Sequence, residues 1–193
     1  MAQECDTGIQ GVGKIAWGSH FCNFYHSEID LAECAVPFFK AGLDSNEMGF
    51  WITSDPLNAR EARRLLGTLQ PDLADQEASG QITIVDFADW YLGPTGSVTA
   101  EALRESLERL AAAQQRGWAG VRMSGNSFWL ERKYWALFSE YEQKLEQVVR
   151  ASRIVVLCSY SLQRCSVRDR AEILRHHDFA ITRCETGWQI AKI

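Results

Sequence analysis

Short apolar runs alternate with stretches of helical periodicity along the chain, and this alternation restricts the fold more than any other feature of the sequence. Strands that are separated by helices need crossover connections, which predict a mostly parallel central sheet flanked by helices, an α/β fold. The apolar runs predict strands at residues 20–25, 48–53, 81–87, 120–124 and 153–159. The helical patterns cover residues 29–43, 58–69, 99–116, 131–149 and 167–176.

Four further features refine this prediction. Residues 153–159 form the most continuously apolar run, which is typical of a strand at the centre of a sheet. Residues 179–190 predict a C-terminal β-hairpin, and Pro37 is expected to kink or divide the first helix. Residues 1–14 contain scattered glycines and predict a flexible lead-in. The whole chain, residues 1–193, is expected to form one domain.

Charge and hydropathy exclude several classes of protein. Lys and Arg total 20 and Asp and Glu total 25, so the formal net charge is -5. A chain with this charge and without a basic run is a poor candidate for binding nucleic acid or an anionic membrane. No stretch approaches the roughly 20 apolar residues of a transmembrane helix. Residues 1–13 lack the basic and apolar segments of a secretory signal, which favours a cytoplasmic protein.

Six cysteines are present, but their spacing is not typical of a disulfide framework or a zinc ribbon. There is no C-x-x-C pair, and the chain is not a short secreted one. We expect reduced thiols, several of them buried as small apolar side chains. The cysteines are Cys5, Cys22, Cys34, Cys158, Cys165 and Cys184.

The segment from Gly8 to Ile15 nearly matches the phosphate-binding loop G-x-x-x-x-G-K-[ST]. That loop binds phosphate because a strand delivers it and a helix follows it. Here no strand is predicted before Gly8, an aromatic strand follows instead of a helix, and Ile15 replaces the hydroxyl that binds magnesium. The match therefore does not predict a working nucleotide site.

Other catalytic patterns are also missing. Asp86 ends an apolar run as a magnesium-binding acid does in nucleotide hydrolases, but capping is an equally good explanation without a phosphate loop. Ser124 follows a strand without the G-x-S-x-G pattern of a nucleophile elbow. His176 and His177 lie near a helix end, where the helix C-terminus favours them. We therefore expect no enzyme activity.

His20 and Cys22 are two residues apart on one predicted strand, so their side chains share a face. Such a pair is suited to two metal ligands or to an axial ligand of a tetrapyrrole. A histidine hydrogen-bonded within the core beside a packed thiol explains the same pattern, and the sequence identifies no cofactor.

The predicted strand ends carry aromatic and polar residues that together resemble the lining of a small-molecule pocket. Ligands of open α/β sheets bind outside the carboxyl ends of the strands, and aromatic walls favour apolar ligands. The residues predicted to line one such pocket are His20, Cys22, Tyr25, Trp51, Ser54, Trp90, Trp129 and Tyr160.

Several segments resemble the MEDS domain, a sensory domain of methanogens, methylotrophs and the regulator of dichloromethane dehalogenase. The similar segments are residues 17–25, 37–43, 46–47, 51–54, 158–160 and 167–181, and the resemblance extends over residues 8–190. It implies a RecA- and KaiC-like fold without a working phosphate loop. The family's His and Cys motif corresponds to His20 and Cys22, and its Tyr corresponds to Tyr25.

The resemblance also implies a function. Members of the family are thought to sense small hydrocarbon derivatives and to act on histidine kinases, anti-sigma regulators or DNA-binding output domains in prokaryotic signal transduction. No output domain follows here, which implies a stand-alone sensor or an excised input domain, and a homodimer is compatible with either. Three alternatives remain open: a divergent nucleotide-binding ATPase or phosphotransfer protein, a metal- or tetrapyrrole-binding sensor that uses His20 and Cys22, and an interaction protein that binds no ligand.

Overall fold

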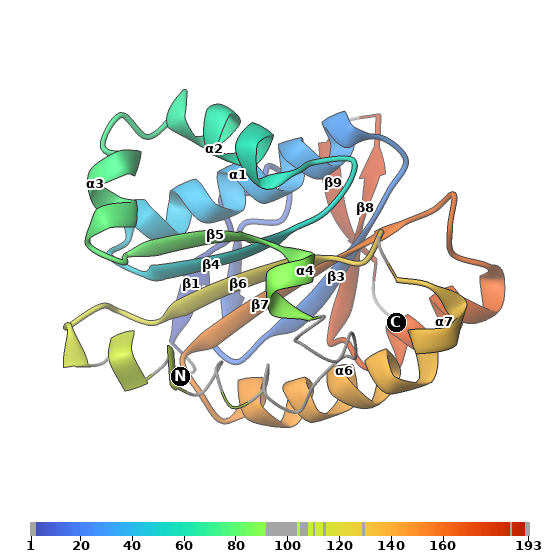
Figure 1. Cartoon of the computed structure of the whole chain (residues 1–193). Helices are drawn as coiled ribbons and strands as arrows, with labels where there is room; N and C mark the ends of the chain where they lie inside the picture. Colours follow the sequence, from blue (N-terminus) through green and yellow to red (C-terminus); the bar gives the residue numbers. More distant parts are fainter. Residues whose placement is uncertain are drawn as a thin grey trace.

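The computed structural model describes residues 3–91, 104, 108–109, 111–113, 115–128, 130–185 and 187–191. Seven strands form one sheet in the order β5-β4-β6-β7-β3-β8-β9 (Figure 1). All pairings in it are parallel except that of β8 with β9, which form the antiparallel hairpin at the C-terminus. The predicted α/β fold and its hairpin are thus confirmed. The strands are β3 (His20–Tyr25), β4 (Met48–Thr53), β5 (Ile82–Asp86), β6 (Val121–Asn126), β7 (Ile154–Ser161), β8 (Phe179–Cys184) and β9 (Gly187–Ala191).

Strand β7 occupies the middle of this sheet, as its continuous apolar run predicts. It pairs with β6 on one side and with β3 on the other, and all eight of its residues are buried. A parallel strand with helices on both faces has no solvent-facing side, so it does not need alternating polar residues.

Helices cover both faces of the sheet (Figure 1). The helices α1 and α2 pack on one face and contribute to a first apolar cluster, and α4, α6 and α7 contribute to a second cluster on the opposite face. We call these the α1 face and the α6 face. The helices are α1 (Glu28–Asp44), α2 (Ala59–Gly67), α3 (Leu73–Ala78), α4 (Phe87–Trp90), α6 (Trp135–Arg150) and α7 (Val167–Leu174), with a 3-10 turn η1 (Arg132–Tyr134) before α6.

Helix α1 begins at a capping box, in which the Ser27 side chain accepts from the Asp30 backbone and the Asp30 carboxylate accepts from the Ser27 backbone. It runs through Pro37 as one helix of 17 residues, so the proline does not divide it. Short α3 was not predicted from the sequence. The predicted helix 99–116 lies largely outside the described residues, although residues 104, 108–109, 111–113 and 115 are helical.

The N-terminal segment differs from the flexible lead-in that the sequence predicts. Strands β1 (Glu4–Asp6) and β2 (Lys14–Ala16) pair with each other, and the turn between them buries Ile9 at 2% exposure. Arg122 of β6 donates hydrogen bonds to the carbonyls of Asp6 and Thr7, which fixes the segment to the sheet. Isolated apolar residues between glycines gave no periodic signal of this packing.

The near-match to a phosphate-binding loop lies in this N-terminal hairpin. Strand β1 precedes Gly8, contrary to the prediction that no strand does, but strand β2 rather than the helix of a phosphate-binding loop follows Gly13. Among the described helices, none combines the length and the apolar character needed to span a membrane.

Candidate functional site

The structure divides the predicted pocket between the two faces of the sheet. Side chains alternate along a strand, so His20 and Cys22 point to the α6 face, whereas Tyr25, an odd number of residues away, points to the α1 face. Trp90 and Tyr160 belong to the α6-face cluster together with Cys22. The described members of the predicted set therefore do not all lie together on one face of the sheet.

The predicted residues on the other side take part in packing and hydrogen bonds of their own. The Tyr25 hydroxyl donates to Asn126 Oδ1 over 2.8 Å, and Ser54 Oγ donates to the Asn126 carbonyl over 3.1 Å. Trp51 stacks on Phe39 of α1 with ring centroids 4.7 Å apart. Trp129 lies outside the described residues. None of these contacts extends to His20.

Four buried side chains with nitrogen, oxygen and sulfur donors converge on the α6 face. His20 comes from β3, Cys158 from β7, Glu142 from α6, and His177 from the turn between α7 and β8. Their donor atoms all lie within 4.8 Å of one another. We call this group the His–Glu–Cys–His cluster.

The distances within the cluster are short. His20 Nε2 lies 3.2 Å from Glu142 Oε2 and 3.3 Å from Cys158 Sγ. Glu142 Oε2 lies 3.4 Å from His177 Nε2 and 3.6 Å from Cys158 Sγ. The carboxylate is thus within 4 Å of each of the other three donors.

Strand register and helix periodicity explain how these distant residues meet. In the parallel pairing of β3 with β7, Cys22 is opposite Cys158, so Cys158 lies diagonally beside His20 on the same face. Glu142 follows Phe138 by four residues on the inward side of α6. Asp178 accepts from the His20 backbone and its own N–H donates to the His20 carbonyl, which holds the adjacent His177 beside β3.

Burial dominates the electrostatics of the cluster. It lowers the pKa of His20 to about 4, although the nearby Asp178 carboxylate acts in the opposite direction. It also lowers the pKa of His177 to about 3 and raises the pKa values of Glu142 and Cys158. Both imidazoles are therefore neutral at neutral pH, and each has one ring nitrogen with a free electron pair.

The tautomer of His177 follows from its partner. His177 Nδ1 lies 2.7 Å from the backbone carbonyl of Ile173, and because a carbonyl only accepts, Nδ1 carries the proton. The lone pair of His177 is thus on Nε2, which faces Glu142. The prediction that the histidine pair interacts with a helix C-terminus is confirmed for His177, since Ile173 lies in the last turn of α7.

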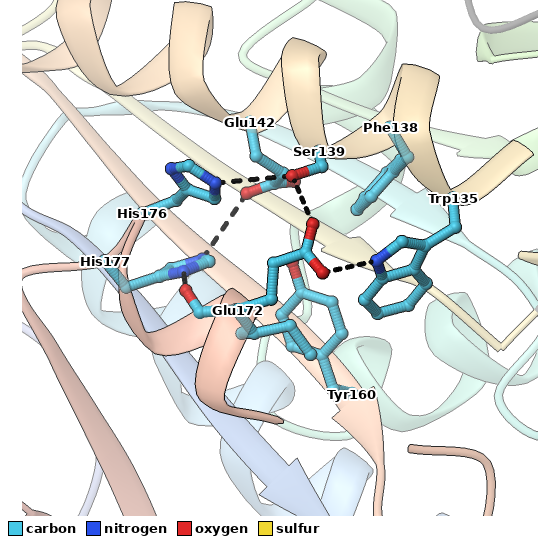
Figure 2. A pocket seen from close by; sticks show the side chains of 9 residues that line it. Trp135, Phe138, Ser139, Glu142, Tyr160, Glu172, His176 and His177 are labelled. Atoms are coloured by element: carbon cyan, nitrogen blue, oxygen red, sulfur yellow. Dashed lines mark hydrogen bonds and ion pairs between the residues drawn. The ribbon is translucent and has the colours of Figure 1, made fainter. Parts of the chain in front are cut away.

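A small cavity lies beside the cluster (Figure 2). Its walls include Phe138 and Trp135 from α6, Tyr160 from β7, and Glu142 and His177 from the cluster. The cavity volume is about 10 Å³, which is the space of about one water molecule. A hydrocarbon derivative therefore does not fit in this conformation unless a wall side chain moves.

A hydrogen-bond chain joins four of the residues that line the cavity. Glu172 of α7 accepts from Trp135 Nε1 over 3.0 Å and from Ser139 Oγ over 2.9 Å, and Ser139 also contacts His176 Nε2 over 3.3 Å (Figure 2). These contacts tie α7 to α6 over the cavity. A change in the cavity would thus be transmitted to the packing of the two helices.

Sequence reasoning missed Glu142 and did not group Cys158 and His177 with His20. The available signal was an acidic residue inside the apolar stripe of residues 131–149, because a buried carboxylate needs charged or polar partners. The expected thiols are present: all six cysteines are free, and Cys184 alone among them is not fully buried.

Comparison with protein families agrees with this architecture. The family model named MEDS, the methanogen/methylotroph, DcmR sensory domain, matches residues 19–178. The chain belongs to the MEDS family. The matched range contains all four residues of the His–Glu–Cys–His cluster. A comparison with curated proteins found no match.

A solved structure shows the same fold. The crystal structure of a KaiC-like protein from the hyperthermophilic archaeon Pyrococcus horikoshii superposes with a TM-score of 0.67 and 16% sequence identity. The superposition covers 100% of this chain and 89% of that chain. This MEDS domain thus has a RecA- and KaiC-like fold, as the resemblance in its sequence implies.

Proposed function

We propose that this MEDS domain is a non-catalytic sensor that receives a small molecule at the His–Glu–Cys–His cluster and its adjoining cavity. The observation that carries the proposal is four buried ionisable side chains gathered on one face of the sheet. Burying such groups is costly, and strongly perturbed pKa values cluster at functional sites. The family to which the chain belongs supports a sensory role.

The ligand that suits this site is small and largely apolar, such as a simple hydrocarbon derivative. Phe138 and Trp135 offer apolar walls, and the cluster offers one polar contact point. Because the cavity holds about one water molecule, binding requires a displacement of these walls. The displacement would loosen the Glu172 contacts between α6 and α7 and so carry the signal outwards.

We propose that this signal passes by protein contacts to a histidine kinase or an anti-sigma type regulator in a prokaryotic cytoplasm. Two-component signalling and transcription regulation are the processes in which such contacts act, with the domain as a monomer or a homodimer. The net charge of -5 supports protein partners over nucleic acid or an anionic membrane.

A matched pair of tyrosine variants tests the location of the sensory site. Tyr160→Phe removes a hydroxyl on the α6 face, and Tyr25→Phe removes one on the α1 face. Thermal unfolding is measured with dichloromethane and with methanol as probes, since a ligand that binds the folded state raises the midpoint. We expect the probes to raise the unfolding midpoint of the wild type. Tyr160→Phe should change the size of this rise, and Tyr25→Phe should retain it. Equal rises for both variants would place the site elsewhere, and no rise with a wider series of one-carbon compounds would contradict the sensor.

The fold also favours one alternative, a nucleotide-binding protein related to KaiC-like ATPases. The start of α1 argues against it, because only His26 and Ser27 connect β3 to α1 and the capping box already binds the backbone N–H groups of Ser27 and Asp30. Glu28 and Asp30 in its first turn would repel phosphate. Isothermal titration with Mg-ATP separates the two functions: micromolar binding would favour the alternative.

A further inference from the structure

We propose that His20, Glu142, Cys158 and His177 together bind one divalent transition-metal ion of the zinc class. The site deepens the proposed function, because it places an ion at the sensory cluster, and the ion's role in sensing rests on that function. The existence of the metal site does not rest on the proposed function, because it follows from the donor geometry, the His177 tautomer and the charge of the donors.

Four of the six donor–donor distances are close to the edges of a tetrahedron around zinc, and the other two are at most 4.8 Å. With Zn–N and Zn–O bonds of about 2.0 Å and a Zn–S bond of about 2.3 Å, tetrahedral vertices lie about 3.3 Å apart for N and O and about 3.5 Å apart for N and S. The measured separations are 3.2 Å and 3.4 Å from the two histidines to Glu142, and 3.3 Å from His20 to Cys158. The Glu142 to Cys158 separation of 3.6 Å fits as well.

The orientation of His177 is that of a metal ligand. A histidine that ligates through one nitrogen almost always donates the other N–H to a carbonyl or carboxylate, which fixes the ring and its tautomer. His177 donates from Nδ1 to the Ile173 carbonyl and turns Nε2 towards Glu142 and His20. Among the residues that the structure describes, Nε2 has no hydrogen-bond donor to satisfy it, although the side chain is buried.

Charge selects a divalent ion. A site of two neutral imidazoles, one thiolate and one carboxylate carries two negative charges, which an ion of charge 2+ neutralises. Loading replaces protons with metal: Cys158 gives up its thiol proton, Glu142 gives up its carboxyl proton if it holds one, and both leave to solvent. A neutral, loaded site avoids the free-energy cost of an isolated charge in the interior.

The chemical types of the four donors also restrict which divalent ions the site binds. One thiolate and two imidazoles favour zinc and its transition-metal neighbours, whereas calcium and magnesium prefer oxygen donors. The adjoining cavity of about 10 Å³ leaves no space for a tetrapyrrole, so a bare ion is the occupant. Cys22, the other half of the pair singled out in the sequence, contacts the Phe179 carbonyl rather than the cluster.

Cobalt(II) is the probe that tests the site in the full chain. After EDTA treatment and gel filtration, titration with Co²⁺ is expected to reach one equivalent, with a thiolate-to-cobalt charge-transfer band and the intense d–d absorption of four-coordinate cobalt. Zn²⁺ should displace the colour. Absence of the charge-transfer band in the folded wild type would overturn the proposal.

Two buried cysteines provide the matched variants. Cys158→Ser removes the thiolate from the cluster and should abolish the charge-transfer band and weaken Co²⁺ binding by at least about a hundredfold. Cys34→Ser changes an equally buried thiol on the α1 face and should leave both unchanged. Unchanged cobalt binding by Cys158→Ser would overturn the site.

X-ray absorption of the zinc-loaded wild type needs no variant and so stays decisive if Cys158→Ser does not fold. The expected shell is one sulfur at about 2.3 Å and three nitrogen or oxygen atoms at about 2.0 Å. A shell without sulfur would exclude Cys158. The two proposals fail separately: one-carbon probes without effect on a metal-binding wild type contradict sensing alone, and a stabilising probe on a protein that binds no metal contradicts the ion alone.

Discussion

Acid is expected to destabilise the metal-free protein through its two buried histidines. His20 and His177 have folded pKa values of about 4 and about 3, because burial disfavours the imidazolium form. In the unfolded chain a histidine takes up its proton near pH 6.5. The unfolded state therefore binds more protons as the pH falls below that value, and the free energy of unfolding decreases.

The magnitude follows from these shifts. Between about pH 7.5 and pH 5, each histidine that stays neutral in the folded state and protonates in the unfolded state costs about 2 kcal/mol. Two such groups cost about 4 kcal/mol, a large part of the 5–15 kcal/mol that is typical of a domain. Glu142 acts in the opposite direction, because burial raises its pKa and the folded state takes up that proton first. The contribution of Glu142 therefore reduces the total loss of stability between about pH 7.5 and pH 5.

Urea unfolding followed by tryptophan fluorescence, in EDTA at several pH values, measures this slope. Glu142→Gln removes the opposing proton and should steepen the loss of stability towards pH 5. His177→Gln should make the slope shallower by about one proton, or about 1.4 kcal/mol per pH unit.

A stability that does not change between about pH 7 and pH 5 would refute the reasoning, because it would mean that the buried imidazoles accept protons as readily as the unfolded ones. An equal slope for His177→Gln and the wild type would show that His177 is not the group responsible. Either result would also remove the electrostatic argument that both imidazoles of the metal-free cluster are neutral at neutral pH.

Three further outcomes test the fold and its charges. Arg122→Met should cost about 3–5 kcal/mol because it leaves the Glu47 carboxylate buried and unpaired, whereas Arg122→Met with Glu47→Leu should recover most of that loss in urea unfolding. Val156→Asp should abolish native circular dichroism, since it puts an unpaired carboxylate into the central strand, and a folded variant would show that β7 is misplaced. Asp169→Asn should destabilise the folded protein at neutral pH, because Arg132 holds the pKa of Asp169 below its usual value. The stability that this pair contributes is present above about pH 4 and is lost on further acidification. The free energies of unfolding of the variant and the wild type should therefore converge at lower pH.

The strands and helices were predictable because their signals are local. Each of the five predicted strands overlaps an observed one, and β7 lies at the centre because its apolar run has no polar alternation. The N-terminal hairpin was not predictable in this way. Its burial depends on Ile9 and on hydrogen bonds from Arg122, more than a hundred residues away in the sequence.

The site was predictable only in part, because its residues meet through register. Period-two alternation correctly put His20 and Cys22 on one face, and the same rule applied to Tyr25 would have removed it from the pocket. Which residues approach His20 depends on the pairing of β3 with β7 and on the rotation of α6. Neither the strand pairing nor the helix rotation can be predicted from the residues next to His20 in the sequence.

Two groups of buried charged or ionisable residues in this domain differ in how completely the fold supplies them with hydrogen-bond and charge partners. Arg122 forms a bidentate pair with Glu47 at 2.8 Å and 3.1 Å and donates to the Phe38 carbonyl at 2.6 Å, so its charge is matched by the fold itself. In the His–Glu–Cys–His cluster His177 Nε2 lies 3.4 Å from Glu142 Oε2, and among the described residues no hydrogen-bond partner satisfies this buried nitrogen. A fold gains nothing from such a group unless something else completes it, because a half-satisfied buried network costs more than an apolar core. This difference supports the proposal that function, rather than folding, explains the cluster.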